Sequence, residues 1–321
     1  MLRTLLLLTL AAAPLALVHA GASPEVPKAP LKVFILAGQS NMEGAGAVRA
    51  NPDRNGGKGS LEHLVKDPAT AKRWAHLVDE GEWAVRDDVW IHYFERRGGL
   101  TAGYGAREDR IGPELGFGHV VGDALEEQVL LIKVAWGGKS LAKDFRPPSA
   151  GGEVGPEYRK LFEEVRAVLG GLEERFEGYD GEGYELAGFA WHQGWNDRVN
   201  QAFNDEYEQN LKCFIRDVRE ELEAPDLPFV LAETGMSGHG EKHPRALSLM
   251  RAQAKVAEDP EFAKTVRFVG TKDFYRPGDE SPSNQAYHWN SNAETYLLIG
   301  EGLGQAMLEL LPRHERSKRR R

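Results

Sequence analysis

Ser40 and His288 are the residues of this chain best suited to nucleophilic chemistry. Ser40 follows residues 33–37, an apolar run typical of a buried strand, and it lies two residues after Gly38. A serine at the carboxyl end of such a strand can hold its hydroxyl clear of the sheet, where ligands bind in α/β proteins. A histidine brought to it could take the hydroxyl proton and return it to a leaving alcohol. We expect His288, just before the last helical segment, to supply that base.

The same residues also allow structural interpretations. Ser40 and Glu43 have the spacing of a capping box, in which the serine caps a helix and the glutamate bonds back to its start. His288 could be a polar residue at a helix entry, residues 137–138 could form only a turn, and residues 196–197 could only cap a helix. Catalysis therefore requires that several such clusters meet in space.

Polar or glycine-rich clusters follow the expected strands at four places. They are residues 38–41, 137–140, 192–197 and 233–235, and residues 287–290 form a fifth cluster before the last helix. Because the carboxyl ends of parallel strands lie at one edge of a sheet, we expect these clusters to converge. Backbone N–H groups of Ser40 and Gly138, with the side-chain amide of Asn196 or Gln193, would then form an oxyanion hole.

These motifs resemble the SGNH hydrolase superfamily, and within it the carbohydrate esterase and sialate O-acetylesterase-like branch. Residues 38–42 (Gly-Gln-Ser-Asn-Met) are similar to the block that carries the nucleophile, and residues 135–138 to the block with the oxyanion glycine. Residues 191–197 are similar to the third block, and residues 112–114 (Gly-Pro-Glu) look like a segment common in these esterases. The resemblance covers about residues 33–307. It implies a serine esterase that removes O-acetyl groups from sialic acid, xylan or a related polysaccharide, with no cofactor.

One position departs from the superfamily pattern. The last block of these enzymes has an aspartate three residues before the histidine, where this chain has Gln285. A glutamine can accept a hydrogen bond from the imidazole, but it cannot stabilise an imidazolium by charge. We expect a carboxylate of the 273–280 loop to orient His288 instead, with Asp273 slightly ahead of the others. The alternatives are Asp279, Glu280, Asp197, Glu233, or a Ser–His dyad without an acid.

The elements that must position these residues alternate along the chain. Apolar runs typical of strands alternate with segments of helical spacing, which indicates a parallel sheet covered on both faces. We expect an α/β protein with a three-layer α/β/α architecture, a flavodoxin-like parallel sheet with helices on both faces. Residues 45–82 and 98–112 are expected to be a long excursion and a surface loop. The expected strands are 31–37, 89–94, 128–134, 186–191, 228–232 and 266–270, and the expected helices are 115–125, 158–176, 202–222, 247–257 and 293–311.

The two ends of the chain have a composition different from the rest. Residues 1–20 begin with a positive charge, continue with an apolar stretch and end in Val-His-Ala, which is typical of a secretory signal peptide. We expect a linker over 21–30, one esterase domain over 31–312 and a basic disordered tail over 313–321. The protein should then be secreted or periplasmic, with no stable membrane insertion after signal cleavage.

Composition argues against several other functions. The net charge of −9 disfavours binding to a nucleic-acid backbone. The histidines are scattered, and the pair His239 and His243 lies in a loop with no third ligand candidate nearby, so we expect no metal. No glycine-rich nucleotide loop follows a strand.

Tryptophans give modest support for a carbohydrate ligand. Indole faces stack on pyranose rings, and five tryptophans fall near expected strand ends, although packing in the core is the plainer interpretation. They are Trp90, Trp136, Trp191, Trp195 and Trp289. The second candidate function is a catalytically silent carbohydrate-binding protein on the same scaffold, which Gln285 makes conceivable.

Overall fold

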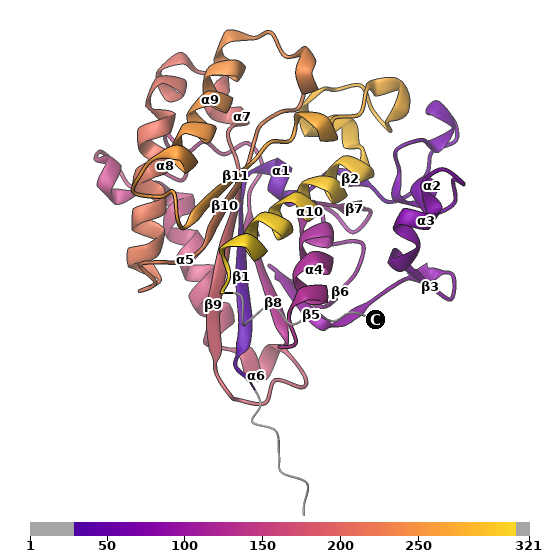
Figure 1. Ribbon diagram of the computed structural model, residues 1–321, viewed down its shortest axis with the longest axis horizontal. Helices are drawn as coiled ribbons and strands as arrows, with labels where there is room; N and C mark the ends of the chain where they lie inside the picture. Colours follow the sequence, from indigo (N-terminus) through magenta and orange to yellow (C-terminus); the bar gives the residue numbers. More distant parts are fainter. Residues whose placement is uncertain (1–28, 313–321) are drawn as a thin grey trace, which may run out of the picture.

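The computed structural model describes residues 29–312 (Figure 1). The expected signal peptide, most of the linker and the basic tail lie outside the described residues.

A seven-stranded sheet forms the centre of the structure, in the order β11-β10-β9-β1-β8-β5-β6. All neighbouring pairs are parallel except β5 and β6. The expected three-layer α/β/α architecture is confirmed. The strands are β1 (Leu31–Gly38), β5 (Arg86–Tyr93), β6 (Arg96–Leu100), β8 (Val129–Ala135), β9 (Tyr184–His192), β10 (Phe229–Ala232) and β11 (Val266–Val269).

Helices cover both faces of this sheet, because β1 is apolar on both sides. Phe34 and Leu36 pack in the core beneath α4 (Pro113–Ala124) and α10 (Ala293–Leu310), whereas Val33 and Ile35 pack in the core on the opposite face. The alternation follows from the two-residue period of a strand. The second face is covered by α5 (Pro156–Leu169), α8 (Gln201–Glu221) and α9 (Pro244–Glu258).

The prediction of a surface loop over residues 98–112 was partly wrong. Arg96–Leu100 forms β6, an antiparallel edge strand, although its Arg-Arg-Gly-Gly sequence has no apolar alternation. This strand is formed by backbone hydrogen bonds to β5, without support from an apolar pattern. Two small antiparallel sheets were also missed, and they pair β2 (Gly46–Ala47) with β7 (Arg110–Ile111) and β3 (Val78–Asp79) with β4 (Glu82–Trp83).

The expected helix over 158–176 is two helices. α5 ends at Leu169, and α6 (Leu172–Arg175) follows after Gly170 and Gly171. Glycine is the least favourable helix residue after proline, and two in succession end α5. The remaining short helices are α1 (Ser40–Glu43), α2 (Leu61–Leu64), α3 (Ala71–Trp74), α7 (Trp195–Arg198), η1 (Asn55–Gly57), η2 (Ala75–Leu77), η3 (Pro148–Ala150), η4 (Gly238–Gly240), η5 (Lys272–Phe274), η6 (Gly278–Glu280) and η7 (Tyr287–Ser291).

Gly38 ends β1 at the point where the sheet order changes direction. It lies in register with Ala135 of β8 on one side and His192 of β9 on the other. Its φ is +153°, and a Cβ there would lie 2.3 Å from the carbonyl oxygen of His192, so only glycine fits. Ser40 therefore emerges at a topological switch point, where α/β proteins bind ligands.

Candidate active site

Ser40 is the first residue of α1, and its hydroxyl is uncommitted. Gln39 is the N-cap residue and caps without a side-chain bond, so the capping-box interpretation of Ser40 and Glu43 was wrong. Glu43 instead accepts a hydrogen bond from the backbone of Gly137, and burial raises its pKa. Within residues 29–312 the half-buried Ser40 side chain makes no hydrogen bond, which leaves its oxygen open to a substrate.

Gln39 ties the turn that carries Ser40 to the loop after β9. Its Oε1 accepts the backbone N–H groups of Gly194 and Asn196 at 3.1 and 3.3 Å, while its Nε2 donates to Asn196 Oδ1 at 3.4 Å. The side chain is 1% exposed, so these bonds form in a dry environment. Gln39 thus fixes the position of Asn196 relative to Ser40, a role that its place in the sequence motif did not reveal.

Of the two glycines after β8, Gly137 lies directly beside Ser40. A Cβ placed on Gly137 would be 3.7 Å from the Ser40 Cβ, whereas one placed on Gly138 would meet nothing within 4 Å. Gly138 has a φ of +72°, and the Asn196 side-chain amide donates to its carbonyl oxygen. This bond places the expected oxyanion donors Asn196 and Gly138 next to each other, and the Asn196 amide keeps a second hydrogen for a ligand.

Gln193 does not fit the expected role of an oxyanion donor. Its Nε2 already donates to Asp197 Oδ2 at 2.6 Å and to the Lys139 carbonyl at 3.0 Å, with Gln39 Oε1 at 3.3 Å. The amide has two hydrogens, the side chain is 1% exposed, and these three acceptors consume both hydrogens. Gln193 supports the loop from beneath.

His288 lies in a turn with an unusual backbone. Residues 288–291 all have φ between +51° and +57°, a left-handed conformation that costs non-glycine residues energy. Asn290 holds the turn, since its Oδ1 accepts the Ala286 N–H at 2.8 Å and its Nδ2 donates to the Arg276 carbonyl at 3.0 Å. Strain of this kind clusters at functional sites, where the surroundings impose it.

The turn of His288 and the turn of Ser40 lie at the same edge of the sheet. The ring of Trp289 is 6.3 Å from that of His192, the residue in register with Gly38. Tyr296, in α10, donates from its hydroxyl to Asn41 Oδ1 at 3.2 Å. Among the described contacts no hydrogen bond joins the Ser40 side chain to that of His288.

The environment of His288 favours the form that a general base needs. Burial lowers the pKa of its imidazole, which keeps the ring neutral at neutral pH. The neighbouring Tyr287 ring lies edge-on to it, with centroids 4.9 Å apart. A neutral imidazole can accept a hydroxyl proton, whereas an imidazolium cannot.

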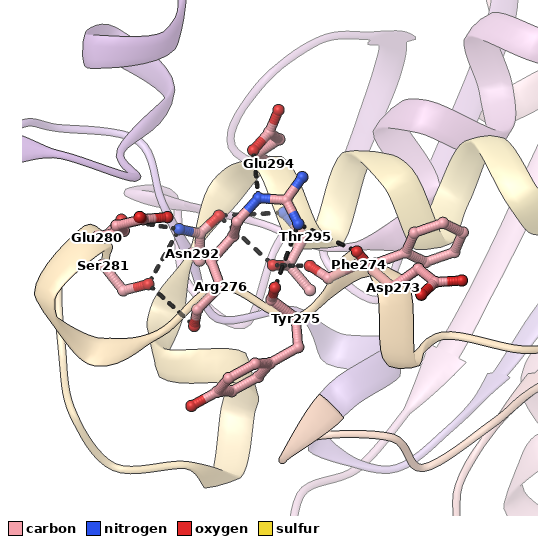
Figure 2. Close-up of polar contacts among 9 residues, drawn as sticks. All are labelled: Asp273, Phe274, Tyr275, Arg276, Glu280, Ser281, Asn292, Glu294 and Thr295. Carbon is pink, nitrogen blue, oxygen red and sulfur yellow. Dashed lines mark hydrogen bonds and ion pairs between the residues drawn. The ribbon is translucent and has the colours of Figure 1, made fainter. Parts of the chain in front are cut away.

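Asp273, the favoured orienting acid, is paired elsewhere. Its Oδ1 lies 2.7 Å from His239 Nε2, and the two side chains are 84% and 73% exposed. Figure 2 shows that the loop behind Asp273 is fastened to the start of α10, where Arg276 binds Glu294 at 2.7 Å and Thr295 donates to the Phe274 carbonyl at 2.6 Å.

The other expected carboxylates do not contact His288 either. Glu233 pairs with Lys272 at 2.9 Å, and Asp197 accepts the N–H groups of Leu141 and Ala142. The remaining candidates, Asp279 and Glu280, are exposed. In the described part of the chain, no carboxylate forms a hydrogen bond with the His288 ring.

The tryptophans divide between core and site. Trp191 and Trp289 are 1% and 0% exposed and belong to the core, as the plainer interpretation held. Trp195 is half-buried, with the Arg198 guanidinium 3.9 Å from its ring centroid and the Tyr287 ring 6.2 Å away. Tyr287 is 41% exposed, so this aromatic pair beside His288 is open to a ligand.

Two supporting residues were missed by the sequence analysis. Asn290 gave no signal, because nothing in the Tyr-His-Trp-Asn sequence indicates a left-handed turn. Lys133 did give one, since it is a lysine inside the apolar run of β8, and the structure buries it completely. No group of three or more histidine, cysteine, aspartate or glutamate side chains in residues 29–312 could hold a metal ion.

Comparison with known families decides what kind of protein this is. The family described as carbohydrate esterase, sialic acid-specific acetylesterase, matches residues 30–309. This chain belongs to that family. It is therefore a carboxylic ester hydrolase, and the resemblance found in its motifs is confirmed.

Solved structures share the fold at low sequence identity. A protein from Arabidopsis thaliana is 17% identical, with a TM-score of 0.57, covering 88% of this chain and 99% of its own. NanS is 15% identical, with a TM-score of 0.55 and coverage of 87% and 97%. A carbohydrate acetylesterase from Xanthomonas citri is 13% identical, with a TM-score of 0.54 and coverage of 87% and 56%.

Two further findings concern related proteins and the helices of this chain. No curated protein matches this chain. In the described residues, no helix has both the length and the apolar character required to cross a bilayer.

Proposed function

We propose that this protein removes O-acetyl groups from carbohydrates, with Ser40 as nucleophile and His288 as general base and acid. Family membership supports the reaction class. The observation that carries the residue assignment is the uncommitted Ser40 hydroxyl at the end of β1, beside Gly137 of the loop after β8. The backbone N–H groups of Ser40 and Gly138 and the Asn196 amide are the proposed oxyanion donors.

The proposed reaction proceeds in two halves. Ser40 Oγ bonds to the acetyl carbonyl carbon as His288 takes the hydroxyl proton, and His288 then protonates the sugar oxygen as the ester C–O bond breaks. Water next gives its proton to His288 and attacks the acetyl-serine. Acetate leaves, and His288 returns the proton to Ser40.

We further propose that His288 works without a charged orienting acid. Gln285 stands where the superfamily has an aspartate, and the expected carboxylates, Asp273 included, are committed to other partners or exposed. Asp273 could reach the imidazole only by leaving His239. Because that pair is exposed, its separation costs about 1 kcal/mol or less.

The exposed Tyr287 and half-buried Trp195 support a sugar ring as the part of the substrate beside His288. The substrate proposed is an acetylated polysaccharide or sialic acid, which the enzyme would meet in the periplasm or outside the cell. That location rests on the signal-like composition of residues 1–20.

Hydrolysis of 4-nitrophenyl acetate, and acetate release from an acetylated xylan, test the proposal. We expect Ser40→Ala to lower both rates by roughly 10³-fold or more, because the covalent step is lost. Thermal unfolding of the variant should stay close to that of the wild type. Equal and negligible rates for the two proteins would instead favour the silent carbohydrate-binding function.

A further inference from the structure

A lysine is buried beneath the turn that carries Ser40. Lys133 lies in β8 with its side chain 0% exposed, and its Nζ donates three hydrogen bonds of 2.7 Å each. The acceptors are the Glu43 carbonyl, the Tyr104 carbonyl and Glu114 Oε2. Burying such an ion pair seldom stabilises a fold more than apolar side chains of the same size would. A contribution to stability is therefore a weak reason for this arrangement.

The three acceptors belong to three separate segments. Glu43 is the last residue of α1, Tyr104 lies in the loop after β6, and Glu114 lies in the first turn of α4. Glu114 also accepts the Gly112 N–H at 2.7 Å, and a Cβ on Gly44 would lie only 2.1 Å from the Gly112 Cα. Lys133 thus joins the end of α1 to the segment packed directly against it.

The same connection reaches the oxyanion glycines. The Glu43 carboxylate accepts a hydrogen bond from the Gly137 backbone, and Gly137 lies beside Ser40. One residue, Glu43, is therefore held by Lys133 through its carbonyl and holds the 137–138 loop through its carboxylate. We propose that Lys133 is a positioning residue, which sets the Ser40 turn against the oxyanion loop and so determines turnover. This inference rests on the proposed role of Ser40.

Two variants separate positioning from stability. Lys133→Met leaves Glu114 buried without its partner, so the melting temperature and kcat should both fall. Adding Glu114→Gln removes that uncompensated charge, and the double variant should recover part of the lost melting temperature, since the Glu43 and Tyr104 carbonyls still lack their donor. Its kcat should stay on the order of 10²-fold below the wild type, with KM within about threefold, because the tie to Glu43 is still absent. Recovery of kcat together with the melting temperature would overturn the proposal.

A second lysine–glutamate pair in the same sheet, with a buried lysine and a partly exposed glutamate, provides the control. Lys32 of β1 is also buried and bonds to Glu185 at 2.7 Å, but at the opposite end of the strand from Ser40. Lys32→Met with Glu185→Gln should leave kcat within about threefold of the wild type. A fall as large as that of the Lys133 double variant would show that any buried lysine affects turnover, and would count against positioning.

Hydrogen exchange provides a readout that does not depend on esterase activity. The amides of Met42, Glu43 and Gly44 donate within the turn, to the carbonyls of Gln39 and Ser40. In the Lys133 and Glu114 double variant these amides should exchange at least tenfold faster, while the β1 amides stay protected. Unchanged exchange would overturn the inference. Should Ser40→Ala match the wild type in hydrolysis, the proposed function fails, and exchange alone still decides the role of Lys133.

Discussion

Ser40 and His288 illustrate how much the type and position of a single residue reveal about a site. The placement of Ser40 at a strand end and the polar clusters at other strand ends were sufficient to predict which segments meet. The role of Gln193 was not predictable in this way. The sequence does not distinguish a glutamine whose amide faces a substrate from one whose amide is already hydrogen-bonded. Here the Gln193 amide donates to Asp197 and to a backbone carbonyl.

The orienting acid can be tested with two exposed side chains. We expect Asp273→Asn and His239→Gln each to change kcat by less than about threefold, because their mutual contact is a surface pair of low energy. Steady-state hydrolysis of 4-nitrophenyl acetate measures both. A loss of 10²-fold or more in Asp273→Asn, with His239→Gln unaffected, would mean that Asp273 moves to His288 during catalysis and would refute the dyad.

At the scale of elements, periodic segments were predictable and irregular ones were not. The six parallel strands have apolar runs long enough to be recognised. β6 lacks such a run, because an edge strand can be built from backbone hydrogen bonds alone. The left-handed turn at 288–291 contains no glycine, so its conformation comes from tertiary contacts that no local pattern encodes.

The role of that turn in placing His288 can be tested by replacing Asn290. Asn290→Ala removes the bonds to the Ala286 N–H and the Arg276 carbonyl, which should cost about 1–3 kcal/mol of unfolding free energy and release the strained backbone. With His288 displaced, kcat should fall at least tenfold. Chemical denaturation and steady-state kinetics measure the two effects.

The control for Asn290 is Asn200, whose side chain also accepts backbone N–H groups but lies in a different segment. Asn200 caps α8 through its side chain, and Asn200→Ala should cost about 1 kcal/mol without changing kcat. If both variants lost stability and neither lost turnover, the strained turn would have no part in placing His288.

For the whole molecule, buried histidines set the response to acid. Burial lowers the pKa of His92 and His119 to about 4 and that of His192 to about 3. In the unfolded chain these rings titrate near 6.5, so below that pH the unfolded state binds more protons than the folded state. Stability is then lost progressively as the pH falls from about 6.5 toward 4.

Asp197 has the opposite effect on the pH dependence of stability. Burial raises its pKa to about 6, so the folded state takes up its proton first, which adds some stability between about pH 6 and 4. Burial also lowers the pKa of His288 and raises that of Glu43, so four histidines oppose two carboxyls. The histidines outweigh the carboxyls, and the melting temperature should fall over this range. His119→Gln should show a smaller fall than the wild type in thermal scans at each pH. A melting temperature that is flat or rises on acidification would contradict the buried, neutral state of these rings.

The covalent role of Ser40, assisted by His288, can be observed directly with a serine-reactive fluorophosphonate and peptide mass mapping of the whole protein. We predict a single adduct on the peptide containing Ser40, and its formation should slow by about 10²-fold or more in His288→Ala, since the general base is gone. Labelling of an active wild-type enzyme at another residue, or labelling of Ser40 at an equal rate without His288, would contradict the mechanism.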